Sequence, residues 1–372
     1  AEGIFCIITT CNFTSSANAS NDSALINNRL YQYSFIALLT SIILFIGLQL
    51  CIDPLLKLIN LSDTLKSHIS TYLKIMSFSI TPLLLIQVSI SWFTGLKKPK
   101  IALYVLIMSS SINIVLDIFF VFVLNMDIDG VALASVIAQY STALFVLLFV
   151  LNYQKKNLPN NKVNPSYWLS NKQVLSFGST LLFRSGILLS VLLIFNLESA
   201  SINETTVAAN ALLMTILILI SSVLDATASS AQVQISNKSE KLHGVLNSTF
   251  FIMCVFVLGF VVAILVFGKY YLSLMSNQVN VVSLAIEYLP WMALLCVSSS
   301  TSYWLDGVFL GWQKSKWMRN SVLIPAILIY FPIVYIFELS NHQLWMSLNL
   351  FMLMRSLCMW LYFVKKVKAL QP

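Results

Sequence analysis

The segment from Lys97 to Tyr140 constrains the fold more than any other, because it joins two long apolar runs through a short polar turn. The first run extends for about 24 residues, which is the length of a membrane-crossing helix. The turn covers residues 126–130, and a second apolar run follows it directly. We therefore expect a transmembrane helical hairpin, with helices over residues 101–125 and 131–152.

One carboxylate interrupts the first helix of this hairpin. Asp117 has no cation next to it in sequence, and an acid in hydrocarbon is costly, so its default interpretation is an ion or proton site inside a helix bundle. Asn113 lies one turn earlier on the same face. Ser135 lies at a similar membrane depth on the other side of the turn. The sequence predicts a polar cluster of Asn113, Asp117 and Ser135 between two antiparallel helices.

The composition places the whole chain in a membrane. Its 372 residues are 58% hydrophobic and 10% charged, with a mean hydropathy of +0.84, which excludes a water-soluble globule. The formal charge of +8 comes from short basic clusters between apolar runs. Such clusters indicate membrane topology rather than nucleic-acid binding. Predicted spans hold no histidine at mid-membrane and no HExxH pattern, which argues against a membrane enzyme.

The pattern of apolar runs predicts an all-α polytopic protein with eleven helices. The basic clusters fall on alternate loops, so we expect these loops and the C-terminus to be cytoplasmic. The expected helices are at about residues 2–17, 30–58, 71–96, 101–125, 131–152, 173–198, 206–235, 243–275, 283–312, 320–337 and 343–364.

A polar segment with two prolines, residues 157–172, is the natural boundary between two halves. It predicts an N-lobe over residues 1–156 and a C-lobe over residues 173–372, joined by a cytoplasmic loop. The halves share short sequence matches. FTGLKKPK from Phe93 matches FLGWQKSK from Phe309 at an offset of 216 residues, and SSA from Ser15 matches SSA from Ser229 at an offset of 214.

Parallel repeats of this kind are a transporter architecture. The offset places the start of the first half roughly 44 residues before Ala1, which is about one helix with its loop. We therefore expect two pseudo-symmetric six-helix lobes from which the first helix is missing.

The second half carries further polar residues inside predicted helices. Arg184 and Asp225 lie at matching depths on consecutive helices, so we expect a pair, and we favour a structural role for it. Asp306 lies near the cytoplasmic end of its helix, where a functional acid and a solvated capping acid are both consistent with the sequence. Asn210 and Gln232 either line a cavity or bridge helices. These five residues form a candidate C-lobe polar network.

The hairpin motifs SINIVLD (residues 111–117) and GVALASVIAQ (residues 130–139) resemble the multidrug and toxin extrusion family, in its DNA-damage-inducible protein F branch. Three further motifs look similar to that branch as well: Phe183-Arg184, Leu224-Asp225 and Leu305-Asp306-Gly307. The resemblance covers essentially the whole chain, from the family's second helix to its twelfth.

The resemblance implies cation-coupled antiport that exports mostly cationic amphipathic compounds. It also implies that Asn113, Asp117 and Ser135 form the N-lobe polar cluster, with Ser where Thr is usual. Two departures stand out. The family's first helix, with an essential acid facing that cluster, is absent from this sequence, and Gln232 stands where the branch often has Glu.

The leading hypothesis is a secondary active antiporter for drugs, toxins or metabolites that works by alternating access. H⁺ is preferred to Na⁺ as coupling ion, although the Asn113 and Asp117 oxygens would suit either ion. The alternatives are a flippase for lipid-linked precursors, which would need a basic cavity, and a truncated remnant without transport.

We expect a monomer in a bacterial inner membrane, with lipid and a small substrate as its partners and with no cofactor or metal.

Overall fold

The computed structural model describes residues 2–20, 22–57, 63–157, 172–236, 242–336 and 340–368, and every regular element in these ranges is a helix. The chain forms two compact units, Glu2–Leu175 and Ser176–Pro372. The expected inter-lobe loop lies outside the described residues except for Asn157 and Lys172, which each belong to a helix.

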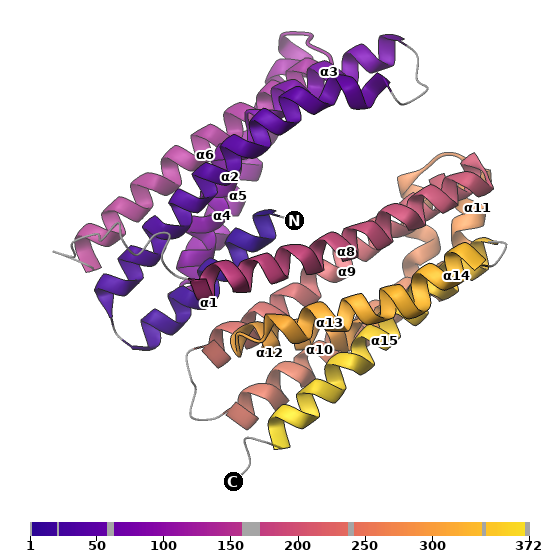
Figure 1. Ribbon diagram of the computed structural model, residues 1–372. Helices are drawn as coiled ribbons and strands as arrows, with labels where there is room; N and C mark the ends of the chain where they lie inside the picture. Colours follow the sequence, from indigo (N-terminus) through magenta and orange to yellow (C-terminus); the bar gives the residue numbers. More distant parts are fainter. Residues whose placement is uncertain are drawn as a thin grey trace. The chain divides into compact units, whose positions relative to one another are not determined.

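The first unit is built around the helix pair α1 and α4 and the hairpin of α5 and α6. Helices α2, α4, α5 and α6 run alongside one another (Figure 1). The elements are α1 (Glu2–Ala19), α2 (Ser23–Lys57), α3 (Asp63–Ser77), α4 (Ile80–Gly95), α5 (Pro99–Ile118), the π-helix η1 (Phe119–Val123) and α6 (Ile128–Asn157).

The second unit is organised around α12, which packs against α9, α10 and α15. Its elements are α8 (Lys172–Ile202), α9 (Glu204–Ser236), α10 (Leu242–Met275), α11 (Val279–Glu287), α12 (Leu289–Gly311), α13 (Ser315–Pro325), the π-helix η2 (Ala326–Tyr330), α14 (Phe331–Ile336) and α15 (Asn341–Lys368).

The surface of these helices carries many large apolar side chains, and two charged side chains within the membrane, those of Arg184 and Arg355, face the interior. Phe122 and Phe251 are 76% and 68% exposed, whereas Arg184 and Arg355 are 6% and 2% exposed. Within the described ranges, eight helices are long and apolar enough to cross a membrane, or ten if each of two bent pairs crosses once. The expectation of an all-helical polytopic membrane protein is confirmed.

Two predicted helices are broken in the structure. The expected helix at 71–96 is α3 followed by α4, bent by 46°, and the expected helix at 283–312 is α11 followed by α12, bent by 47°. Each break lies just before a proline, Pro82 in the first turn of α4 and Pro290 in that of α12. Proline lacks the N–H that would continue a helical ladder, but it fits the first turn of a new helix. The helices that follow the breaks, α4 and α12, are the two that carry the shared sequence match.

The sequence repeat corresponds to one repeated turn. Lys97 and Gln313, which are 216 residues apart, both have a left-handed backbone, with φ of 60° and 57°. The next residues, Lys98 and Lys314, each donate a backbone hydrogen bond of 2.9 Å, Lys98 to Phe93 and Lys314 to the corresponding phenylalanine. This six-to-one bond after a left-handed residue is the Schellman end of a helix. The repeat is therefore a structural repeat of α4 and α12.

Close helix packing explains the glycines near this turn. A Cβ on Gly95 would lie 2.8 Å from the carbonyl oxygen of Cys11 in α1. A Cβ on Gly307 would lie 2.6 Å from the Cα of Ala228 in α9 and closer still to its carbonyl oxygen. Small residues of this kind let transmembrane helices approach each other at backbone distance.

We predict that Gly307→Ala lowers the stability of the second unit by about 1–3 kcal/mol or more, because the new methyl group meets backbone that cannot move aside. Gly259→Ala is the matched control, since nothing lies within 4 Å of its Cβ position. That variant is expected to gain up to about 1 kcal/mol from helix propensity. Thermal unfolding of the purified protein, followed by tryptophan fluorescence, measures both. Equal midpoints for the two variants would contradict the packing argument.

Candidate functional site

The predicted hairpin cluster lies between α5 and α6. The side-chain amide of Asn113 donates a hydrogen bond of 3.2 Å from Nδ2 to Oγ of Ser135. This bond joins the two helices at the depth that the sequence indicated. The structure thus brings Asn113 and Ser135 together.

Asp117 lies one turn after Asn113 on the same helix face but is not hydrogen-bonded to it. Its Oδ1 atom is buried and has no hydrogen-bond partner among the described residues. An unsatisfied carboxylate oxygen in a low-dielectric site is costly, so such atoms in native proteins call for a water, an ion or a proton. The hairpin therefore contains one acceptor without a donor, Asp117 Oδ1, near the hydrogen-bonded pair Asn113 and Ser135.

The hairpin changes its helical type directly after Asp117. η1 begins one residue beyond Ile118, and its wider turn is closed by a bond from Leu124 N to Phe119 O. Turns of π-helix inside α-helices occur frequently at functional sites. No proline or glycine marks η1 in the sequence, so nothing in the pattern could have indicated it.

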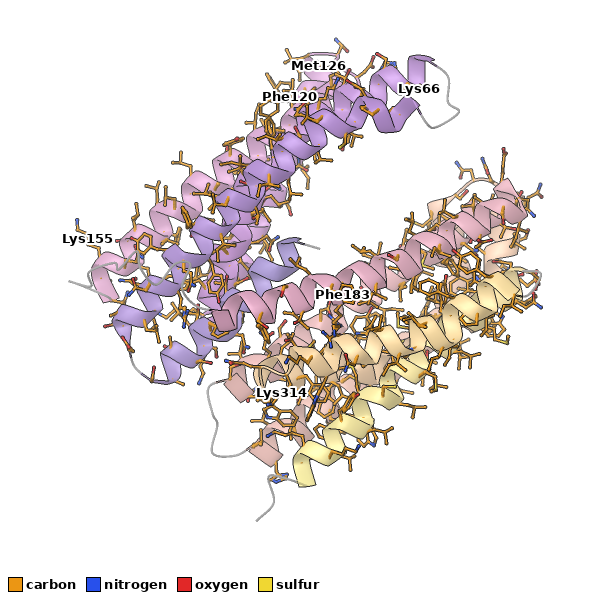
Figure 2. All side chains as sticks on the ribbon, viewed as in Figure 1. Lys66, Phe120, Met126, Lys155, Phe183 and Lys314 are labelled. Carbon is orange, nitrogen blue, oxygen red and sulfur yellow. The ribbon has the colours of Figure 1, made fainter. Side chains whose placement is uncertain are left out.

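The turn itself is tight. Phe120 and Met126 lie next to each other at this end of the hairpin (Figure 2) and are joined by a backbone hydrogen bond of 3.0 Å. A Cβ on Gly130 would lie 2.6 Å from that of Met126. Glycine at this position therefore lets α6 begin directly against η1 and keeps α5 and α6 in register.

A second polar cluster lies inside the second unit, and it differs from the predicted one. Arg184 in α8 and Arg355 in α15 both donate from Nη2 to the same oxygen, Oδ2 of Asp306 in α12. The expected pair of Arg184 with Asp225 is wrong, because Arg184 forms its salt bridge with Asp306 instead. Equal depth in the membrane does not fix the direction in which two helices face each other.

Asp225 in α9 is exposed and forms no salt bridge in the described part of the chain, although it lies within electrostatic range of Asp306 and both arginines. Arg355 is the residue that the sequence analysis missed. It is a basic residue in the middle of the last apolar run, and the rule that such residues are functional or paired would have selected it. The ring of Tyr303 lies 5.8 Å from the Arg355 guanidinium carbon.

The other two predicted network residues lie elsewhere. Asn210 belongs to a separate buried cluster, where its Nδ2 donates to Ser199 Oγ and Asn341 Oδ1 at 2.8 Å each, and its Oδ1 accepts from Trp345. It lies fifteen residues before Asp225 on the same helix, or about 22 Å along the axis. Gln232 is buried where α9 meets Gly311 of α12. The predicted network is therefore three separate groups.

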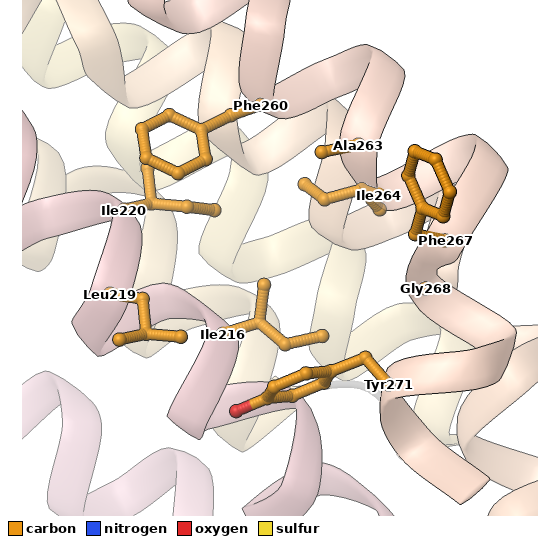
Figure 3. A pocket seen from close by; sticks show the side chains of 9 residues that line it. All are labelled: Ile216, Leu219, Ile220, Phe260, Ala263, Ile264, Phe267, Gly268 and Tyr271. Atoms are coloured by element: carbon orange, nitrogen blue, oxygen red, sulfur yellow. The ribbon is translucent and has the colours of Figure 1, made fainter. Parts of the chain in front are cut away.

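An apolar groove of about 190 Å³ lies between α9 and α10 (Figure 3). Its lining has no charged side chain, and its one phenol, Tyr271, lies 3.5 Å from the Thr215 hydroxyl. Such a groove accepts hydrocarbon but offers no group that could exchange a proton. The two polar clusters remain the candidates for chemistry.

We predict strong energetic coupling between Arg184 and Asp306 and clearly weaker coupling between Arg184 and Asp225. In a double-mutant cycle, Arg184→Gln combined with Asp306→Asn should deviate from additivity by about 0.5–3 kcal/mol, as residues in one ion-pair network do. The same arginine variant combined with Asp225→Asn should be close to additive. Unfolding of the purified protein measures all variants. Larger coupling of Arg184 to Asp225 than to Asp306 would contradict this prediction and favour the pair expected from the sequence.

Comparison with known proteins agrees with this architecture. The MatE family profile matches residues 10–119 and 176–336. The DNA damage-inducible protein F of Escherichia coli K12 is 27% identical over 360 residues, which are 95% of this chain and 78% of that protein.

Protein DETOXIFICATION 43 of Arabidopsis thaliana is 26% identical over 293 residues, which are 77% of this chain and 55% of that protein. A solved multidrug resistance MATE family transporter in an outward-facing conformation superposes with a TM-score of 0.86 at 15% identity, covering 100% of this chain and 85% of that one. Together with the all-helical membrane fold, these matches establish that the chain belongs to the multidrug and toxin extrusion family, MatE, and is a membrane transporter rather than an enzyme.

Proposed function

We propose that this transporter is a proton-coupled antiporter of a bacterial inner membrane, that it exports amphipathic and mostly cationic compounds, and that Asp117 exchanges the coupling proton. The observation that carries this proposal is the buried, unpartnered Oδ1 of Asp117 beside the hydrogen-bonded pair Asn113 and Ser135. A carboxylate in this position can take up a proton without displacing an existing hydrogen bond.

The local hydrogen bonding favours H⁺ over Na⁺ as the coupling ion. A hard cation needs several oxygen ligands at once, whereas a proton needs one acceptor. The Ser135 oxygen already accepts the bond from Asn113, which leaves it one lone pair for another partner. Protonation of Asp117 would add a donor to this cluster, and that donor could compete for the Ser135 oxygen. Such a switch gives the two protonation states different helix contacts, which is what a population shift requires.

Alternating access is supported by the repeated scaffold. Two repeated units that each contain a broken helix are an architecture in which one repeat moves as a body during transport. The helix ends at Lys97 and Gln313 and the bends before Pro82 and Pro290 are candidate positions for this movement. Hinge residues absorb backbone changes at element ends of this kind.

A flippase for lipid-linked precursors is a second candidate, because one observation favours it. Arg355 adds a second buried cation beside Arg184, and a flippase would need cations to hold a phosphate. Asp306 lies between the two arginines and cancels one of their charges. Loss of function in Arg184→Gln or Arg355→Gln, with Asp117 dispensable, would favour the flippase over the antiporter.

We predict that Asp117→Asn reduces substrate-driven proton release from inside-out vesicles by at least about tenfold, as expected when a group needed for the coupled step is lost. The vesicles are acidified, ethidium is added as a cationic amphipathic probe, and a pH-sensitive dye reports the release. Asp127→Asn is the control, because it makes the same chemical change at an exposed position of the same hairpin. Undiminished release in Asp117→Asn would rule out Asp117 as the coupling residue.

We further predict that ethidium transport is unchanged when Na⁺ is replaced by N-methylglucamine and stops when a protonophore dissipates the proton gradient. The expectation follows from the buried Oδ1 of Asp117, which a single proton satisfies. Transport that survives the protonophore but requires Na⁺ would assign the site to Na⁺.

A further inference from the structure

We propose that the cluster of Arg184, Asp306 and Arg355 is a binding site for an oxyanion, a carboxylate or a phosphate, that belongs to the transported molecule or to a lipid. Only the statement that the oxyanion belongs to a transported molecule rests on the proposed export function. The binding itself involves other residues than Asp117 and is tested without transport.

The cluster leaves hydrogen-bonding groups unused. Nε and Nη2 of an arginine form one edge of the planar guanidinium, and both N–H groups point to the same side. Arg184 and Arg355 each direct Nη2 to Oδ2 of Asp306, yet Nε of each arginine is buried without a hydrogen-bond partner. Oδ1 of Asp306 is also buried without a partner. Three unsatisfied polar atoms thus lie in one cluster of the described structure.

Unsatisfied buried groups of this number are unusual for a purely structural ion pair. Burying charge is compensated only when the remaining protons and lone pairs find partners, and native proteins fill such gaps with water or a ligand. The missing partner has to accept hydrogen bonds from two Nε–H groups. An oxyanion does this, because the guanidinium edge matches the two oxygens of a carboxylate or phosphate. Asp306 Oδ1 then accepts from a water or from a hydroxyl of the ligand.

The charge of the cluster has the sign that an anion requires. Two guanidinium groups face one carboxylate, so the ion triad carries an excess positive charge. The surplus belongs to the salt-bridged triad alone, because Asp225 lies outside the salt bridges but within electrostatic range of both arginines and offsets it. A monoanion would neutralise the triad. The Asp306 side chain is 13% exposed, more than that of Arg184 or Arg355 at 7% and 2%.

The repeat provides an internal comparison. The helix that corresponds to α12 is α4, and the offset of 216 places Ile90 where α12 has Asp306. No acidic or basic residue occurs in Ile80–Gly95, yet α4 packs and ends as α12 does. A helix on this backbone plan therefore forms and ends without a charged residue. The triad is a feature of the second unit alone.

The test is a binding measurement with two probes that differ in charge. The purified protein in phosphatidylcholine nanodiscs is titrated with 4-(1-pyrenyl)butyrate and, separately, with 4-(1-pyrenyl)butylamine. Arg355→Gln and Arg184→Gln are expected to weaken pyrenebutyrate binding by about tenfold or more, the effect of losing a charge-assisted hydrogen bond. Pyrenebutylamine binding should not change. Arg319→Gln is the matched control, because it removes an arginine of the same unit outside the cluster.

The direction of the change in pyrenebutyrate affinity in Asp306→Asn separates the two interpretations. This substitution removes the competing carboxylate, so pyrenebutyrate should bind more tightly, whereas a triad that serves only folding would lose binding in every variant. Arg355→Lys keeps the charge without the planar edge, so its affinity for pyrenebutyrate should lie between those of the parent and Arg355→Gln. This variant replaces the glutamine variant if the latter fails to fold. Asp127→Asn, at an exposed position of the other unit, should bind as the parent does. The binding is measured without a proton gradient, so failure here is separable from failure of proton coupling.

Competition then identifies the source of the oxyanion. Displacement of pyrenebutyrate by benzoate assigns the site to a soluble carboxylate, and displacement by phosphatidylglycerol in the nanodisc assigns it to a lipid phosphate. The proposal is overturned if Arg355→Gln binds pyrenebutyrate as well as Arg319→Gln does, or if Asp306→Asn weakens the binding.

Discussion

The cost of placing a charge in hydrocarbon determines how the second unit is assembled. Three ionised side chains from α8, α12 and α15 meet at a single carboxylate oxygen, that of Asp306. Further along its length, α8 contacts η2, α15 and α9 through polar or aromatic side chains. Tyr330 donates to the Val191 carbonyl, the ring of Phe195 lies against Trp345, and Ser199 accepts from α9. Interhelical hydrogen bonds hold helices together where lipid gives apolar contacts no advantage.

The two units use one backbone plan for different electrostatic purposes. In the first unit the acid follows the repeated turn, since Asp117 lies in α5. In the second unit it precedes the turn, since Asp306 lies in α12. The segment that corresponds to α5, Ser315–Ile336, contains no acid, and α4 contains none either. In each pair of equivalent helices only one therefore contains an acid, and a pseudo-symmetric fold acquires two unlike polar sites.

Local relationships were predictable from the sequence, and relationships that depend on helix rotation were not. Asn113 and Ser135 were placed together because a tight hairpin fixes both the depth and the facing of its two helices. Arg184 was assigned to Asp225 by depth alone, and the structure pairs it with an acid on a helix far along the chain. Arg355 carried a signal, a cation within an apolar run, but its partner could not be named without knowing how α15 packs. The repeat was detectable partly because its shared glycines, Gly95 and Gly311, each lie where another helix comes within 2.8 Å of the Cβ position.

The charge of the exported molecule decides which part of the proton-motive force drives it. Exchange of one proton for a monocation moves no net charge, so only the pH difference contributes. Exchange of one proton for a molecule that carries both a cation and a carboxylate moves one charge inward, which adds about 2.3 kcal/mol for each 100 mV of membrane potential. An oxyanion held by Arg184 and Arg355 would thus give the second unit an energetic role as well as a role in recognition. The proton site at Asp117 would stay the same in both cases, because its chemistry involves no residue of the arginine cluster.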